Sequence, residues 1–236
     1  MISNRIKQLI KKVLLSLTLV FVFSTSLYSI NTYAGKNISP YQLSKNSIVY
    51  QQKETKGKIL IYHTHSREDY VDSNVMEMGE DLANKLEKKG YIVEHVKEDF
   101  SIDYNTAYDK SRNYLLNIDL DEFDLIIDYH RDSLDFSNTE NVKGVNVAKG
   151  MFVYDTTSKN YDKAKLIGDE ISKNIDKFND KIARENFYYE GGINQFNSDL
   201  DDNIVLWESG NNKNSKLEIK RLNTYFASSI DTCLKR

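Results

Sequence analysis

The chain has 236 residues, enough for one sizeable domain or for one domain with an appendage. Its 32 basic and 35 acidic residues nearly balance, so no global field favours nucleic acid or an anionic membrane surface. The single cysteine, Cys233, excludes an intrachain disulfide framework and a cysteine-rich zinc site, so any metal would need nitrogen and oxygen ligands.

Residues 1–34 differ from the rest of the chain. Four cations precede an apolar stretch that starts at Val13 and weakens after Phe23, and the small-residue sequence TYAGK follows. This pattern predicts a cleaved signal peptide, with an uncleaved N-terminal membrane anchor as the alternative, because residues 13–30 approach the ~20 residues that span a bilayer. In both cases the folded part is expected outside the cytoplasm, secreted or anchored to the cell membrane.

Residues 35–57 are polar and lack a sustained period, which predicts a tether, and one domain is expected over residues 58–236. Short apolar runs within that domain predict five strands. Their ranges are 58–63, 91–96, 123–130, 149–156 and 203–208. Apolar residues at helical spacing predict helices between these strands and at the end of the chain. Their ranges are 74–90, 105–118, 161–178 and about 219–230.

Alternating strands and helices predict an α/β fold with an open, mostly parallel twisted sheet and helices on both faces. Ligands of such sheets bind outside the carboxyl ends of the strands. Three of the predicted strands end in side chains that can bind a metal or transfer a proton. They are ILIYHTHSRE with His63, His65 and Glu68, LIIDYHRD with His130 and Asp132, and IVLWES with Glu208.

If these three strands are parallel neighbours, their polar ends meet at one edge of the sheet. Histidines and carboxylates on a rigid edge suit a catalytic zinc, which takes three protein ligands and leaves a fourth position to water. Taken singly, His63 and His65 have an ordinary interpretation as solvated loop residues, whose rings would point to the same side of an extended segment. His130 alone would be a core histidine, whereas a buried Glu208 is costly without a cation or donor nearby.

Several separated motifs resemble the stage II sporulation protein P family of spore-forming bacteria. They are ILIYHTHSREDY, DLIIDYHRDS and GGINQFNSDLDDNIVLWESG followed by an amphipathic helix, in this order from residue 58 to the end. The resemblance implies a zinc amidase-like fold and an exported zinc-dependent peptidoglycan hydrolase, an N-acetylmuramoyl-L-alanine amidase that also acts as an endopeptidase. It further implies action at the cell wall during engulfment, with a lytic transglycosylase and a membrane scaffold as partners.

Transferred to this sequence, the resemblance implies zinc ligands at His65, Glu68 and His130 and a catalytic carboxylate at Glu208. The middle ligand stays open between Glu68 and two alternatives, because in the broader amidases it opens the first long helix. Those alternatives are Glu77 and Glu80.

The expected chemistry is amide hydrolysis, in which Glu208 takes a proton from the attacking water and returns it to the leaving amine. His63 or Arg131 would help to hold the oxyanion. Otherwise His63 would orient a ligand, as Asp132 would orient His130, and Arg131 would meet a peptide carboxylate.

The segment EGGINQF suits a loop that approaches the substrate, although an ordinary turn fits it equally well. Two other functions stay open at this point. One is a catalytically inactive wall-binding or scaffold module, and the other is a zinc amidohydrolase that acts on a different amide.

Overall fold

The computed structural model of the chain describes residues 55–179 and 181–235. The signal peptide or anchor predicted for 1–34 lies outside the described residues, as does the predicted tether except for its last three residues. No helix in the described part of the chain is both long enough and apolar enough to cross a membrane.

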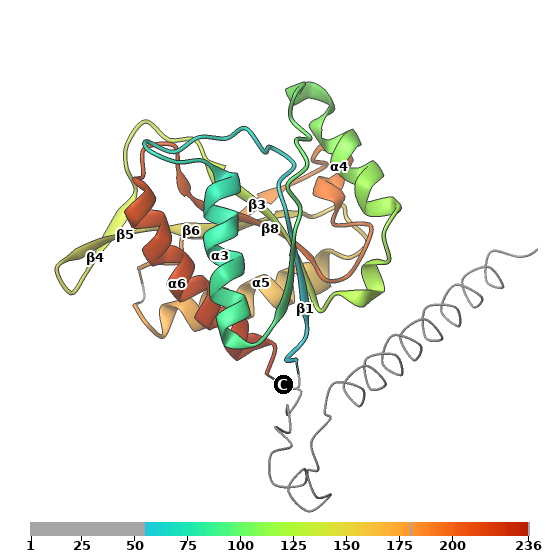
Figure 1. The fold of residues 1–236 in the computed structure, drawn as a ribbon. Helices are drawn as coiled ribbons and strands as arrows, with labels where there is room; N and C mark the ends of the chain where they lie inside the picture. Colours follow the sequence, from blue (N-terminus) through green and yellow to red (C-terminus); the bar gives the residue numbers. More distant parts are fainter. Residues whose placement is uncertain (1–54, 180, 236) are drawn as a thin grey trace, which may run out of the picture. The chain divides into compact units, whose positions relative to one another are not determined.

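A six-stranded sheet with the order β2-β1-β3-β8-β6-β7 forms the centre of the domain (Figure 1). The predicted α/β fold with a mostly parallel sheet is confirmed. β6 pairs antiparallel with β8, so β6 and its parallel neighbour β7 run opposite to the other four strands. The remaining neighbours pair in parallel. The strands are β1 (Lys58–Tyr62), β2 (Ile92–His95), β3 (Leu125–Asp132), β6 (Gly150–Asp155), β7 (Phe187–Tyr189) and β8 (Ile204–Asn211).

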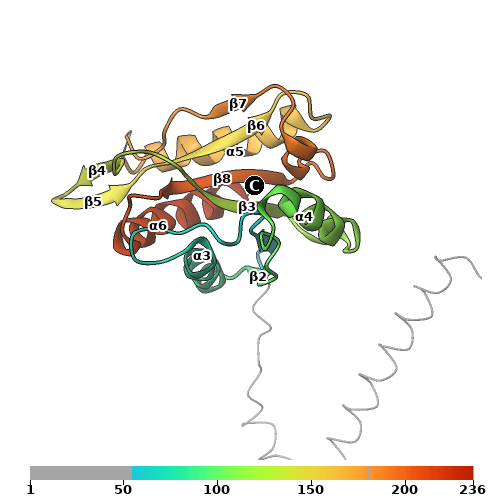
Figure 2. The ribbon, with the colours of Figure 1, turned by 90° about the horizontal axis from the view of Figure 1, so that it is seen from above.

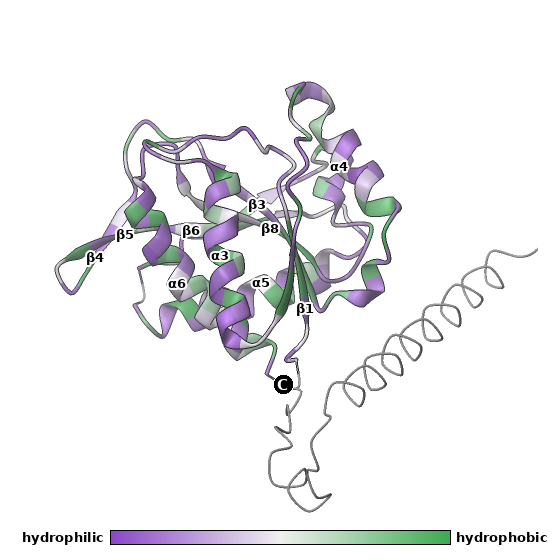
Figure 3. Ribbon diagram, viewed as in Figure 1, coloured by the Kyte–Doolittle hydropathy of each residue, from purple (hydrophilic) through white to green (hydrophobic). Residues whose placement is uncertain are grey.

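Helices cover both faces of this sheet because the central strands are apolar on both sides. Ile59 and Ile61 of β1 belong to a core cluster with three helices, whereas Leu60 and Tyr62 face a second cluster with the fourth helix. The helices of the first cluster are α3 (Val75–Lys89), α5 (Tyr161–Asp176) and α6 (Lys216–Cys233). The helix of the second cluster is α4 (Ala107–Leu116). Figure 3 shows the apolar residues along β1 in the middle of the domain.

Caps set both ends of α3 and the start of α6, two helices that pack against each other. The Asn74 side chain accepts a hydrogen bond from the Glu77 backbone N–H, and Gly90 ends α3 with a φ of 103° that favours glycine. A reciprocal capping box between Ser215 and Glu218 starts α6.

Some elements carry too weak a pattern to be predicted. A hairpin of β4 (Thr139–Val142) and β5 (Val145–Ala148) extends away from the main sheet (Figure 2). Three short 3-10 helices also form in the connections. They are η1 (Tyr104–Thr106), η2 (Leu120–Glu122) and η3 (Ile193–Asn197).

Candidate metal centre and catalytic cleft

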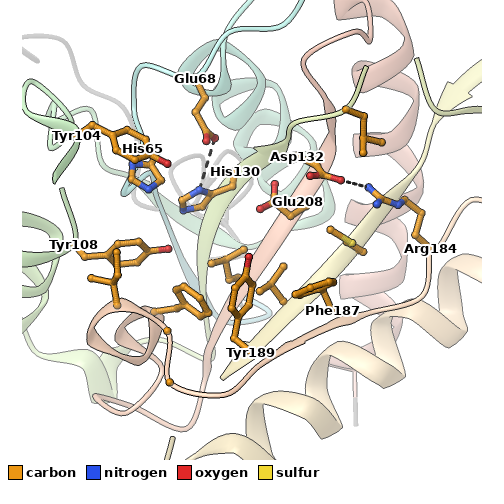
Figure 4. A pocket seen from close by; sticks show the side chains of 18 of the residues that line it. His65, Glu68, Tyr104, Tyr108, His130, Asp132, Arg184, Phe187, Tyr189 and Glu208 are labelled. Carbon is orange, nitrogen blue, oxygen red and sulfur yellow. Dashed lines mark hydrogen bonds and ion pairs between the residues drawn. The ribbon is translucent and has the colours of Figure 1, made fainter. Parts of the chain in front are cut away.

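Parallel pairing brings the ends of β1, β3 and β8 to one edge of the sheet. His130 on β3 lies directly opposite Glu208 on β8 in the strand register. A cleft of about 680 Å³ opens at this edge (Figure 4). His65 and Glu68 line it together with His130 and Glu208, so the structure gathers these four predicted residues in one place.

The His65 ring is held by aromatic neighbours in a turn that follows β1. It stacks on Tyr104 with centroids 4.1 Å apart, contacts the edge of Tyr108, and lies 5.3 Å from the His130 ring. Its Nδ1 atom is buried without a hydrogen-bond partner. Burial, followed by the neighbouring His130, lowers the pKa of His65 to about 4, so its imidazole is neutral near pH 7.

His130 lies between two carboxylates. Its Nε2 is 2.8 Å from Asp128 Oδ1, and its Nδ1 is 3.7 Å from Glu68 Oε2. Burial acts to lower the pKa of His130, but the negative charges of Asp128, Glu68 and Glu208 outweigh it and raise the pKa to about 10. Asp128 is itself fixed, because it accepts hydrogen bonds from the backbone N–H and the hydroxyl of Thr64.

Glu68 reaches the cleft from the loop between β1 and α3. Its Oε2 accepts a hydrogen bond of 3.1 Å from the Arg131 backbone N–H, and burial raises its pKa above the ordinary value. The other candidates for the middle ligand lie outside the cleft lining. Glu77 pairs with Lys216, and Glu80 pairs with His95 and Lys97.

Glu208 is the cleft carboxylate that has a buried oxygen, Oε2, without a hydrogen-bond partner among the described residues. Shielding from water, with Glu68 and Asp132 adding negative charge nearby, raises the pKa of Glu208 to about 8 against the opposing effects of His130 and Arg131. A carboxyl group in this setting can both accept and donate a proton near neutral pH.

His63 lies away from the cleft. The chain turns directly after it, so the expectation that both rings would point to the same side is wrong. Its Nδ1 is 2.8 Å from the carbonyl oxygen of Tyr129, and its Nε2 is 2.9 Å from Nε2 of His95. A side chain at position 79 would come within 2.5 Å of the ring, so Gly79 of α3 makes this packing possible.

Arg131 and Asp132 also differ from their expected placements. The Arg131 side chain donates to the carbonyl oxygen of Asp69 and is absent from the cleft lining, although its backbone holds Glu68. Asp132 pairs with Arg184 at 2.7 Å. The carboxylate beside His130 is instead Asp128, which lies two residues earlier and therefore on the same face of the strand.

Aromatic side chains form much of the remaining cleft lining. The sequence is rich in tyrosine but gives no sign of which rings lie here. They are Tyr104, Tyr108, Phe187, Tyr189 and Phe196. Gly192 leaves room for Phe196, because a Cβ at that glycine would lie 2.3 Å from the ring.

The Asn-Gln segment reaches the cleft through unusual backbone conformations. Residues 194–197 all have φ between 48° and 59°, a left-handed geometry that costs about 1–2 kcal/mol for each non-glycine residue. Side-chain hydrogen bonds hold it, from Asn197 to Ser111 and from Asn194 to Asp109. The expected loop near the substrate is therefore a constrained wall of the cleft.

Two pairwise separations in the cleft match the geometry of zinc ligands. Two imidazoles on one tetrahedral zinc place their ring centroids about 5 Å apart, close to the separation of His65 and His130. Two ligand atoms on such an ion lie about 3.3 Å apart, whereas the 3.7 Å between His130 and Glu68 is too long for a hydrogen bond. Within residues 55–179 and 181–235, no three donors already converge as a finished metal cluster.

The Stage II sporulation protein P (SpoIIP) family matches residues 25–231 of this sequence. The chain belongs to this family. Stage II sporulation protein P of Bacillus subtilis (strain 168) is 28% identical over 199 residues, which cover 72% of this chain and 50% of that protein. The chain thus spans about half the length of this relative.

Two solved amidases have a similar fold. N-acetylmuramoyl-L-alanine amidase AmiC2 of Nostoc punctiforme superposes with a TM-score of 0.51 at 15% identity, covering 77% of this chain and 98% of that one. The CwlD amidase from Clostridioides difficile, solved in complex with the GerS lipoprotein, gives a TM-score of 0.50 at 13% identity, with coverages of 75% and 98%. At these identities the likeness establishes the amidase-like fold alone.

Proposed function

We propose that this sporulation protein is a zinc-dependent N-acetylmuramoyl-L-alanine amidase that cleaves the lactyl-L-alanine amide of peptidoglycan. One observation carries the proposal. Two histidines and a glutamate lie at the same sheet edge as Glu208, a carboxylate whose enclosed oxygen has no protein donor. An aromatic cleft and an amidase-like fold support amide hydrolysis as the reaction.

His65, Glu68 and His130 would hold the zinc. The partnerless Nδ1 of His65 and the 3.7 Å gap between His130 Nδ1 and Glu68 support this set. Asp128 would fix the orientation of His130 through Nε2, an arrangement common around zinc histidines. When bound, the ion would supply a Lewis acid that polarises the amide carbonyl and the attacking water.

Glu208 would carry the proton. Its carboxylate takes a proton from the water as the water oxygen attacks the amide carbon, and returns it to the amide nitrogen as the carbon–nitrogen bond breaks. One water is consumed, and a lactyl carboxylate and an L-alanyl amine leave. The low polarity that raises the pKa of Glu208 to about 8 also makes this proton exchange effective near neutral pH.

The test combines metal analysis with digestion of cell wall. The purified full chain should contain close to one zinc per molecule and release dye from labelled peptidoglycan, and a chelator should stop the release. The change Glu208→Gln should abolish release, whereas the matched change Glu77→Gln, in the pair with Lys216, should leave it intact. Protein that binds wall without solubilising it would instead establish an inactive wall-binding module.

Mass spectrometry of the released fragments identifies the bond. New L-alanine amino termini indicate the amidase, cleavage within the stem indicates the endopeptidase, and loss of acetyl groups indicates another zinc amidohydrolase. Export to the wall side of the membrane, action during engulfment, and cooperation with a lytic transglycosylase and a membrane scaffold complete the proposal. They are supported by the N-terminal sequence pattern and by family membership.

A further inference from the structure

Arg184 is fixed at the rim of the cleft by its backbone. Its N–H donates to the carbonyl oxygen of Gly150 at 2.7 Å, and the Gly150 N–H donates to Ile182 at 3.2 Å. The segment around Arg184 therefore runs beside the start of β6, where Met151 lies opposite Glu208 in the strand register. Neighbouring strands lie about 4.8 Å apart, so this backbone is about 10 Å from that of Glu208.

The guanidinium of Arg184 reaches back across the sheet edge. Nη1 is 2.7 Å from Asp132 Oδ2, and Figure 4 shows this ion pair beside Glu208. Within the part of the chain that the structure describes, Asp132 is the side chain that pairs with Arg184. An arginine has five N–H donors in a planar fork, so the pair uses a fraction of them and sets the direction of the rest.

The surroundings of Arg184 are open on the side of the substrate. Arg184 lines the cleft and also an adjoining hollow, and the two spaces share Met151 and Phe187 as apolar walls. The hollow adds Lys149 and Lys181 against one acid, Glu185. An ion pair in such a half-buried, partly apolar position is weakly hydrated, which strengthens a new contact with an anion.

Within the described residues, Arg184 is the one arginine that lines the cleft, and it keeps N–H donors beyond those that Asp132 uses. These donors suit a substrate carboxylate that lies a short distance from the amide to be cleaved.

We propose that Arg184 binds the free carboxylate of the stem peptide and thereby selects and orients the substrate. The inference rests on the proposed function. The second stem residue, a D-glutamate joined through its side chain, keeps its α-carboxylate free. In an extended chain that carboxylate lies about 6 Å from the nitrogen of the lactyl amide, which is shorter than the separation of about 10 Å between the backbones of Glu208 and Arg184. Arginine matches a carboxylate with two parallel N–H bonds.

The test compares two muramoyl dipeptides that differ in one group. In both compounds the side-chain γ-carboxyl is capped as a methylamide, as it is an amide in the stem. N-acetylmuramoyl-L-alanyl-D-glutamate γ-methylamide carries the free α-carboxylate, and the corresponding D-isoglutamine γ-methylamide carries a neutral carboxamide there. Calorimetric titration of the full chain with Glu208→Gln in place measures binding without turnover. The acid should bind about tenfold more tightly than the amide, in line with a charge-assisted bidentate contact.

Addition of Arg184→Gln should remove this preference, because it weakens binding of the acid and leaves binding of the amide unchanged. Arg184→Lys in its place should keep a part of the preference. The control Arg221→Gln removes an arginine that contacts Asn146 on the β4–β5 hairpin, and should keep the full preference. In the chain with Glu208 intact, Arg184→Gln should raise KM for the acid and leave kcat nearly unchanged.

Equal binding of the two dipeptides, binding of neither, or a preference that survives Arg184→Gln would overturn the inference. These readouts are separate from hydrolysis. A chain that discriminates the dipeptides but never cleaves them would refute the proposed function and leave the carboxylate site standing.

Discussion

The burial of Glu208 predicts how one substitution changes both the stability of the fold and the rate of hydrolysis. Its pKa lies near 8 in the folded protein and near 4.5 for an ordinary glutamate, because the fold shields the carboxyl from water. Between these two pH values the folded state keeps a proton that the unfolded state has released. The unfolded state then binds fewer protons, so the free energy of unfolding falls as pH rises, by up to about 1.4 kcal/mol per pH unit for this group.

Substitution by glutamine removes this cost. In metal-free protein, Glu208→Gln should leave stability nearly unchanged at pH 5 and raise the free energy of unfolding by up to about 3 kcal/mol at pH 7. At pH 8 the difference should reach at most about 5 kcal/mol, and less where water enters the cleft. The same variant should lose at least about 10²-fold in hydrolysis, because the proton carrier is gone.

The assay is urea unfolding of both proteins in excess chelator at pH 5, 6, 7 and 8. The chelator keeps the metal-free state as the one measured. Glu77→Gln serves as the control, since its exposed ion pair with Lys216 is screened by solvent and should leave stability nearly unchanged at all of these pH values. A difference between wild type and Glu208→Gln that stays constant with pH would refute the reasoning, as would a variant that is less stable throughout.

Three further substitutions test local features. Ser215→Ala breaks the capping box of α6 and should cost about 1 kcal/mol in urea unfolding, whereas no loss would mean that the cap is dispensable. Lys143→Asn should raise the free energy of unfolding by about 0.5 kcal/mol. The backbone φ is 52° at Lys143 and 85° at Gly144, as in two-residue hairpin turns that favour Asn-Gly. A lower melting temperature would contradict this. Tyr104→Ala removes the ring stacked on His65 and should lower kcat/KM several-fold, equivalent to about 1 kcal/mol, whereas Tyr104→Phe should match wild type.

The sequence predicted the elements whose pattern is both long and periodic. The apolar runs that became β1, β3, β6 and β8 are buried on both faces, so they lack alternation but stand out as continuous. Helices α3 and α6 were marked by caps as well as by apolar spacing. The gathering of His65, His130 and Glu208 followed from one rule, that parallel strands end at a common edge.

The failures have local causes. The direction of His63 depends on a turn over the residues after Tyr62, and a two-residue spacing applies only while the chain stays extended. The β4–β5 hairpin is short and largely polar, so neither strand produces a hydrophobic pattern. Arg184 lies in the segment between α5 and β7, where the sequence has no recognisable motif. A backbone bridge between Gly150 and the neighbouring Ala183 brings it to the cleft, and local sequence does not predict such a long-range contact. By contrast, Asp128 could have been found, because strand alternation puts it on the face of His130.

The polar groups of the cleft have a common explanation. The enclosed atoms His65 Nδ1 and Glu208 Oε2 lack partners, and burial raises the pKa of Glu68. Each of these features destabilises a metal-free fold, since buried polar atoms without partners cost free energy. If His65, Glu68 and His130 hold a divalent cation as proposed, the ion would bind the free His65 nitrogen, and its positive charge would lower the cost of a negative charge on Glu68 and on the nearby Glu208. Metal binding should therefore stabilise the fold against urea, and a chelator should reverse that gain.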